Sequence, residues 1–139
     1  MRPQVCNHPK LALSPSHPEY DAILKQLREE KTSLNDISVS SKLLALRQLL
    51  QDCGIGTTEE TIVNTHRCLV FFQLKSMLDL VENDLLKKHM PAVSYLRLDG
   101  SVPAGDRQSL VQTFNNDPSI DLLLLTTQVR CSQWKSSEV

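Results

Sequence analysis

The pattern of hydrophobic and polar positions between Arg67 and Thr127 predicts a strand–helix–strand–helix–strand unit. Runs rich in strand-forming residues stand at 67–73, 93–99 and 120–127, and the segments between them carry apolar residues at helical spacing. This alternation is typical of βαβ units with a parallel sheet. Because the runs are largely apolar rather than strictly alternating, we expect helices on both faces of the sheet. The predicted fold class is therefore α/β.

Two amphipathic helices are predicted ahead of this unit. The first begins near Ser16, a candidate cap, and continues along an apolar stripe that starts at Tyr20. The second is capped by Ser40 or Ser41 and ends just before Gly54. A loop rich in Thr, Gly and Glu follows. The predicted domain organisation is a helical approach segment at 1–54, a loop at 55–66, the αβ unit at 67–127 and a disordered tail at 128–139.

Composition and charge restrict the classes of function that the chain can have. The 139 residues are 40% hydrophobic with few aromatics, so the core is expected to be aliphatic. The net charge of −1 argues against a chain that binds nucleic acid by overall charge, so any such contact must be local. No apolar run reaches the roughly eighteen residues of a membrane span, and no signal peptide is evident. Scattered cysteines indicate a reducing compartment, the cytosol or the nucleus.

The motifs of a self-contained active site are missing from the sequence. Neither glycine-rich phosphate-binding pattern, G-x-x-x-x-G-K-[ST] or G-x-G-x-x-G, occurs, so no nucleotide cofactor is expected in this chain. Cys6 and His8 are close enough to suggest zinc, but no second ligand pair follows, and a turn before a helix is favoured. The acidic residues Asp79, Glu82 and Asp84 are interpreted as a solvated helix face. We therefore expect no catalytic residue and no metal site.

Polar and basic residues stand where each predicted strand ends. Gln73 and Lys75 follow the first strand, Asp99 to Ser101 follow the second, and Thr126 and Thr127 close the third. Ligands bind beyond the carboxyl ends of parallel strands, and hydroxyl, amide and ammonium groups suit phosphate oxygens. The alternative is that the same residues only form turns and helix caps. From the residues alone, the two interpretations carry equal weight.

These segments also resemble a known family. Arg67–Gln73, Tyr95–Ser101 and Leu123–Thr127 are similar to the second RecA-like lobe of the Swi/Snf ATPases of helicase superfamily two. Upstream, the segments at 6–9 and 41–43 match what precedes that lobe. Residues 73–79 and 114–121 look most like the TATA-binding-protein-associated factors, which use ATP to remove TATA-binding protein from promoter DNA. The resemblance implies a partial RecA-like lobe at 67–127 with a three-stranded, mostly parallel sheet, preceded by two helices.

Family membership implies a nuclear protein that regulates transcription, uses ATP and Mg²⁺ in its full-length form, and has duplex DNA and TATA-binding protein as partners. Carried over motif by motif, the resemblance places six residues at or near DNA-facing positions: Gln73, Lys75, Ser101, Arg107, Thr126 and Thr127. Arg107 has an alternative of equal weight, an internal ion pair with Asp99 or a neighbouring carboxylate.

The sequence departs from the family after Thr127. The family continues there with a Gly-Gly-x-Gly-x-Asn-Leu turn and later a Gln…Arg…Arg motif, whereas this chain has Arg130-Cys131-Ser132-Gln133-Trp134. The first lobe with its phosphate loop is also missing. We therefore expect a truncated or aberrantly spliced piece that contacts DNA but does not hydrolyse ATP alone. The alternative is a non-catalytic fragment that binds a protein through an exposed strand edge at Leu122–Leu125.

Overall fold

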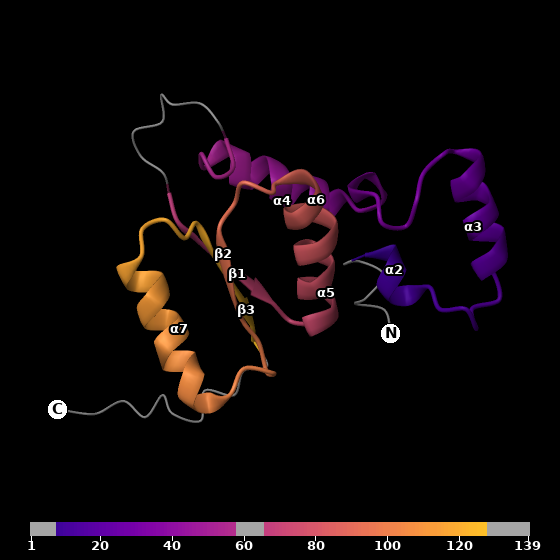
Figure 1. Ribbon diagram of the computed structural model, residues 1–139. Helices are drawn as coiled ribbons and strands as arrows, with labels where there is room; N and C mark the ends of the chain where they lie inside the picture. Colours follow the sequence, from indigo (N-terminus) through magenta and orange to yellow (C-terminus); the bar gives the residue numbers. More distant parts are fainter. Residues whose placement is uncertain (1–7, 58–65, 128–139) are drawn as a thin grey trace.

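The computed structural model describes residues 8–57 and 66–127, and it contains a three-stranded sheet with helices on both faces (Figure 1). The strands are β1 (Cys68–Phe72), β2 (Tyr95–Leu98) and β3 (Leu122–Thr126), in the order β1-β3-β2. Both pairings are parallel, and Leu124 lies between Val70 and Arg97. The predicted α/β class and the parallel arrangement are confirmed.

The two connections between strands are helical, as predicted. From β1 to β2 the chain forms α5 (Lys75–Leu80), a π-helical segment η2 (Val81–Leu86) and α6 (Lys87–His89) without a break. Helix α7 (Ala104–Asn116) joins β2 to β3. Helices α5 and α7 lie on opposite faces of the sheet (Figure 1). The π-helical segment was not predicted, because the apolar stripe through this region fits an ordinary helix.

Each face of the sheet has its own core, and β3 contributes to both. Leu122 and Leu124 pack on the α5 side, whereas Leu123 packs on the α7 side with Phe114 and Ile120. Successive residues of a strand point to opposite faces, so a strand covered on both sides must be apolar at every position. This requirement explains the uninterrupted leucine run of β3.

The exposed-edge hypothesis for Leu122–Leu125 is wrong. Strand β3 is the central strand and pairs with β1 on one side and β2 on the other. Leu122 is 0% exposed and Leu124 is 1% exposed. The chain crosses over the sheet twice, and the last strand enters between the first two. The edges of the described sheet are therefore β1 and β2.

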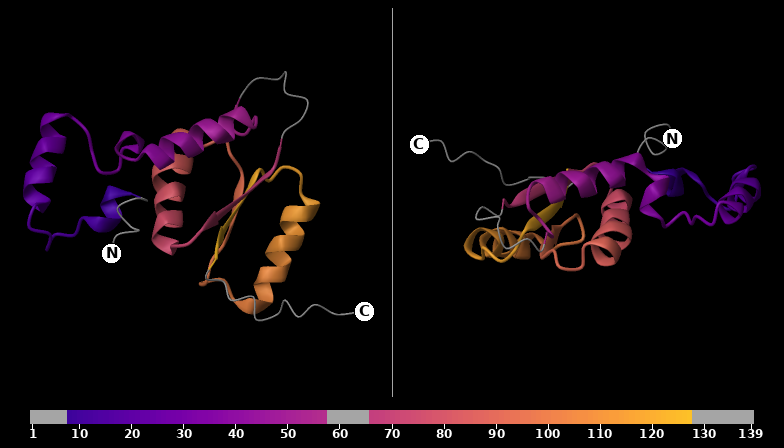
Figure 2. Two further views of the ribbon diagram at one scale, coloured as in Figure 1. Left: turned by 180° about the vertical axis from the view of Figure 1, so that it is seen from behind. Right: turned by 90° about the horizontal axis from the view of Figure 1, so that it is seen from above.

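Within residues 8–57, four helical segments precede the sheet: α2 (Pro9–Ala12), α3 (Tyr20–Glu29), η1 (Ile37–Val39) and α4 (Ser41–Asp52). Helix α4 joins the larger core through Leu43 and Leu50, whereas α3 buries no residue and lies at the far end of the molecule from α7 (Figure 2). The Ser16 cap is wrong, because Glu19 occupies the N-cap position and the Ser16 hydroxyl shares a hydrogen bond with Ser14.

Gly54 ends helix α4 in the way its sequence position predicts. It has a φ of 79°, in the left-handed region that favours glycine. Its N–H donates to the carbonyl oxygen of Gln51, and the N–H of Ile55 donates to that of Leu50, both at 2.9 Å. These two bonds satisfy carbonyls that the helix end leaves open. They also turn the chain so that Ile55 enters the core.

Three sequence predictions lie outside the described residues: the disordered tail at 128–139, most of the loop at 55–66, and Cys6. Of the proposed Cys6–His8 turn, only His8 is described, and it occupies the N-cap position of α2. Within residues 8–57 and 66–127, no three potential metal ligands gather at one point. None of the helices in this part of the chain is long and apolar enough to cross a membrane.

Candidate nucleic-acid interface at the carboxyl ends of the strands

The carboxyl ends of the three strands meet at one edge of the sheet. Because β1 and β2 both run parallel to β3, Phe72, Leu98 and Thr126 all lie at this edge. The N–H of Thr127 donates to the carbonyl oxygen of Phe72 at 2.8 Å, which ties the ends of β1 and β3 together. The segments that follow each strand therefore start side by side. We call this edge the strand-end rim, defined by Gln73, Lys75, Ser101 and Thr127.

The six predicted DNA-facing residues differ in exposure. Gln73, Lys75, Ser101 and Thr127 are exposed, and Arg107 is half-buried. Thr126 is only 5% exposed and lies in register with Phe72, inside the sheet. The structure thus brings four accessible polar side chains to one rim. Thr126 is placed to support that rim rather than to form its surface.

Asp99 shapes the turn that carries Ser101. Its buried carboxylate accepts a hydrogen bond from the backbone N–H of Ser101 at 2.8 Å, and another from the Ser101 hydroxyl. Burial alone would raise the pKa of Asp99, but the hydrogen bonds from Ser101 and Arg97 outweigh it and lower the pKa to about 2. The N-cap of α7 is Pro103, so this contact stabilises a turn and does not cap the helix.

Arg97 is the centre of a charge cluster that sequence reasoning missed. Its guanidinium lies 2.6 Å from a carboxylate oxygen of each of Asp79, Glu82 and Asp99. The Tyr95 hydroxyl also donates to Glu82, at 3.0 Å. These contacts join β2 to α5 and η2. The interpretation of this acidic helix face as solvated is wrong, since Glu82 is half-buried and Asp84, beside it, is 4% exposed.

The contacts within this charge cluster shift the pKa values of Glu82 and Tyr95. Burial raises the pKa of Glu82, but hydrogen bonds from Arg97, Tyr95 and Lys87 outweigh it, and the net direction is downward. Burial and the hydrogen bond to Glu82 raise the pKa of Tyr95 to about 12. Glu82 and Asp99 are therefore carboxylates at neutral pH, beside the charged Arg97. Two spacings in the sequence could have indicated this cluster. Asp79 and Glu82 are three residues apart and Arg97 and Asp99 are two apart, which puts each pair on one face of its element.

Arg107 does not form the ion pair with Asp99 that was one of its two interpretations. The Asp99 carboxylate is already bound by Arg97 and Ser101. The Nε of Arg107 donates instead to the carbonyl oxygen of Val102 at 3.1 Å. Among the residues that the structure describes, no carboxylate pairs with Arg107. This contact holds the arginine in the first turns of α7, just after the turn that carries Ser101.

Sequence comparison relates the chain to helicase-type proteins. Residues 41–130 match the family described as "Helicase conserved C-terminal domain". The chain is 58% identical over 132 residues to the human protein "TATA-binding protein-associated factor 172". It is 49% identical over 139 residues to "TATA-binding protein-associated factor MOT1" of Saccharomyces cerevisiae. Each match covers 91% of this chain but only 7% of the relative, so the chain spans a small part of the length of these relatives.

Two solved structures share the fold. The C-terminal part of the Fun30 ATPase domain is 30% identical with a TM-score of 0.51, and the match covers 63% of this chain and 25% of that one. The Sulfolobus solfataricus SWI2/SNF2 ATPase C-terminal domain has a TM-score of 0.54 at 13% identity, and the match covers 83% of this chain and 50% of that one. The second likeness concerns the fold alone.

Proposed function

This chain belongs to the helicase conserved C-terminal domain family, as part of the second lobe of a Swi/Snf-type ATPase, and on this premise we propose that its strand-end rim contacts duplex DNA. The proposal assigns the chain to an ATPase that acts on TATA-binding protein at promoters, in the nucleus. The relatives support this assignment because they are named as TATA-binding protein-associated factors. TATA-binding protein is proposed as a partner of the longer protein.

The observation that carries the proposal is the convergence of exposed hydrogen-bond donors on one rim. Gln73 supplies an amide, Lys75 an ammonium group and Thr127 a hydroxyl, whereas the Ser101 hydroxyl donates to Asp99 and stabilises the turn at the rim. Such groups bind phosphate oxygens and position a protein on a duplex without reading its sequence. With a net charge of −1 on the whole chain, the attraction to DNA has to come from this local group.

The chain's own residues do not fit a resident ATP and Mg²⁺ site. The sequence has no glycine-rich phosphate loop, and no metal-ligand cluster occurs in residues 8–57 and 66–127. The proposal therefore places no hydrolytic step on this chain. ATP and Mg²⁺ belong, in this proposal, to the first lobe of a longer protein.

The proposal is tested by fluorescence anisotropy of the full chain with a labelled DNA duplex at several salt concentrations. We expect binding that weakens as the salt concentration rises, since each phosphate neutralised by a cation such as Lys75 contributes about −0.9 to the log–log slope. Lys75→Gln should weaken binding and make that slope shallower. The control is Lys25→Gln, on the distant helix α3, which should change neither. Binding that does not depend on salt concentration would refute the proposal that the rim contacts DNA. Equal affinity and equal salt dependence of the Lys75→Gln and Lys25→Gln variants would refute it as well. ATP turnover by the purified chain would refute its assignment as non-hydrolytic.

A further inference from the structure

Two cysteines from different elements lie side by side in the structure. Cys53 is the C-cap residue of α4, and Cys68 is the first residue of β1. Their thiols are partners in a side-chain hydrogen bond, and both side chains pack against the larger core, on the α5 face of the sheet. Both are free thiols and both are half-buried. The fold therefore brings two thiols into contact at a place that solvent reaches in part.

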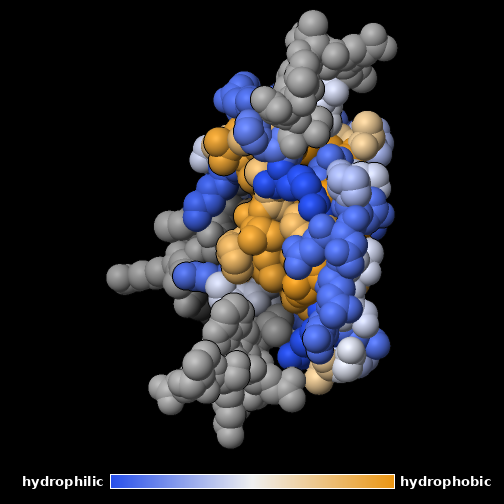
Figure 3. Space-filling view, turned by 90° about the vertical axis from the view of Figure 1, so that its left-hand side faces the viewer, coloured by the Kyte–Doolittle hydropathy of each residue, from blue (hydrophilic) through white to orange (hydrophobic). Residues whose placement is uncertain are grey.

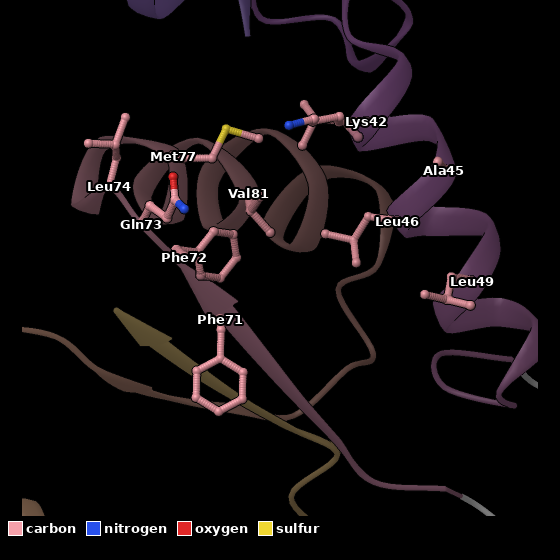
Figure 4. A pocket seen from close by; sticks show the side chains of 11 residues that line it. Lys42, Ala45, Leu46, Leu49, Phe71, Phe72, Gln73, Leu74, Met77 and Val81 are labelled. Carbon is pink, nitrogen blue, oxygen red and sulfur yellow. The ribbon is translucent and has the colours of Figure 1, made fainter. Parts of the chain in front are cut away.

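The packing of α4 along the sheet explains why the two cysteines meet. Helix α4 and strand β1 run in opposite directions on the two sides of a groove of about 570 Å³, which Leu49 and Phe72 help to line (Figure 4). The end of α4 therefore lies toward the start of β1. There the N–H of Cys53 donates to the carbonyl oxygen of Leu49 at 3.1 Å, and the N–H of Cys68 donates to that of Asp121 at 2.9 Å. Each cysteine is thus held by the backbone of its own element.

We propose that Cys53 and Cys68 form a reversible disulfide bond in the folded chain when it meets a small disulfide oxidant, oxidised glutathione. A disulfide forms only where two cysteine side chains already point toward each other, since its geometry leaves little freedom. The hydrogen-bonded thiols meet that requirement. A bond of this kind also agrees with the reducing compartment that the sequence indicates, because disulfides there are mostly transient and redox-sensing.

The reaction consists of two thiol–disulfide exchanges. In the first, one protein thiol loses its proton and its thiolate attacks a sulfur of oxidised glutathione. The sulfur–sulfur bond of glutathione breaks, a mixed disulfide forms, and the released glutathione takes up the proton. In the second, the other protein thiolate attacks the protein sulfur of the mixed disulfide, and the second glutathione leaves with the second proton. The protein loses two electrons and oxidised glutathione gains them. An excess of reduced glutathione reverses both steps.

The position of the two thiols determines which product accumulates. Burial and the neighbouring Cys53 raise the pKa of Cys68, which lowers its fraction of reactive thiolate at neutral pH. The second exchange nevertheless takes place between neighbours, so it should outpace the attack of a second glutathione molecule. We therefore expect the cross-linked chain and not the mixed disulfide. The cross-link joins the end of α4 to the sheet, so the oxidised chain should unfold at a higher urea concentration than the reduced chain.

Peptide mapping of the unsubstituted full chain tests the proposal. Trypsin cleaves between Arg67 and Cys68, so Cys53 and Cys68 fall on separate peptides, 48–67 and 68–75, and the other two cysteines fall on other peptides. The chain is equilibrated with oxidised glutathione, its remaining thiols are alkylated, and the digest is analysed by mass spectrometry without reduction. We expect the peptides 48–67 and 68–75 to be joined with the loss of two hydrogen atoms. They should separate when the chain is first treated with reduced glutathione.

A matched variant moves one thiol to the other face of the sheet. Leu69 follows Cys68, stands in register with Leu123 and is 54% exposed. Figure 3 shows apolar surface, bordered by hydrophilic residues, on the side of the molecule where α7 lies. The variant Cys68→Ser/Leu69→Cys keeps the number of thiols but directs the second one to this side, because successive strand residues point to opposite faces. It should give mixed disulfides with glutathione and little link to Cys53.

A second control uses the parent chain and needs no substitution. In urea that unfolds the chain, the share of the link between peptides 48–67 and 68–75 should fall, because the other cysteines then compete for the same partners. Circular dichroism before oxidation confirms that the variant is folded. The proposal is overturned if the folded parent chain gives only mixed disulfides, if the link is as abundant in the folded variant, or if unfolding leaves its share unchanged.

Discussion

The guanidinium carbon of Arg67 lies 4.0 Å from the centroid of the Phe114 ring. The same side chain donates to the carbonyl oxygens of Ile120 at 2.9 Å and Asp117 at 3.1 Å, and also to that of Phe114. Arg67 thus joins the start of β1 to the C-terminal end of α7 and the turn before β3. A cation is favourable at a helix C-terminus and over an aromatic face. These contacts fasten α7 onto its side of the sheet.

Arg67→Ala should lower the free energy of unfolding by about 2 kcal/mol, because it leaves the carbonyl oxygens at the end of α7 without their charged donor. Urea denaturation followed by circular dichroism measures the change. The control is Arg28→Ala, at the exposed end of α3, which should alter the free energy by less than about 0.5 kcal/mol. Similar midpoints for the two variants would show that the Arg67 contacts add nothing to stability.

Arg97→Met should be more damaging than the loss of a surface ion pair. It removes the partner of three carboxylates, and the side chains of two of them, Glu82 and Asp99, are 16% and 1% exposed. Removing one partner of buried charges costs about 3 kcal/mol or more. The destabilisation should be large at pH 7 and smaller near pH 4, where the orphaned carboxylates can take up protons. Equal destabilisation at both values would mean that the cost lies in packing and not in charge.

The lowered pKa of Asp99 makes the free energy of unfolding depend on pH. Its value is about 2 in the folded chain, against an ordinary 3.8, so the folded state binds the proton less readily than the unfolded state. The stabilisation is present above about pH 4 and is lost as the pH falls toward 2. We expect the free energy of unfolding to decline over that window, and to decline less in Asp99→Asn. A parent-like slope in Asp99→Asn would contradict the assignment.

Gly56 and Gly105 form a matched pair for substitution. Gly56 has a φ of 72°, and a Cβ there would lie 2.8 Å from the side chains of Met90 and Val93. Gly56→Ala should therefore lower the free energy of unfolding by about 1–3 kcal/mol. Gly105 lies in α7 with open space around a Cβ, so Gly105→Ala should raise stability by up to about 1 kcal/mol. Thermal unfolding of both variants checks the opposite signs.

Local residue patterns determined a large part of this protein. The three strands, the helices that connect them and the stop at Gly54 all follow from side-chain periodicity and turn chemistry, which act over a few residues. The meeting of Gln73, Ser101 and Thr127 at one rim followed as well, because parallel strands end on the same side. To predict that these residues lie together, it was enough to know that the strands are parallel.

The tertiary structure alone decided the order of the strands and the partners of the charges. The same leucine run at Leu122–Leu125 suits an edge or a centre, and long-range pairing put it in the centre. Likewise, the sequence around Asp79 and Glu82 is that of an ordinary solvated helix face. Only the fold shows that Arg97, from strand β2, forms ion pairs with both. Periodicity records which face of an element is apolar. Periodicity does not show which distant segment packs against that face, because the packing partner is set by the free energy of the whole folded structure.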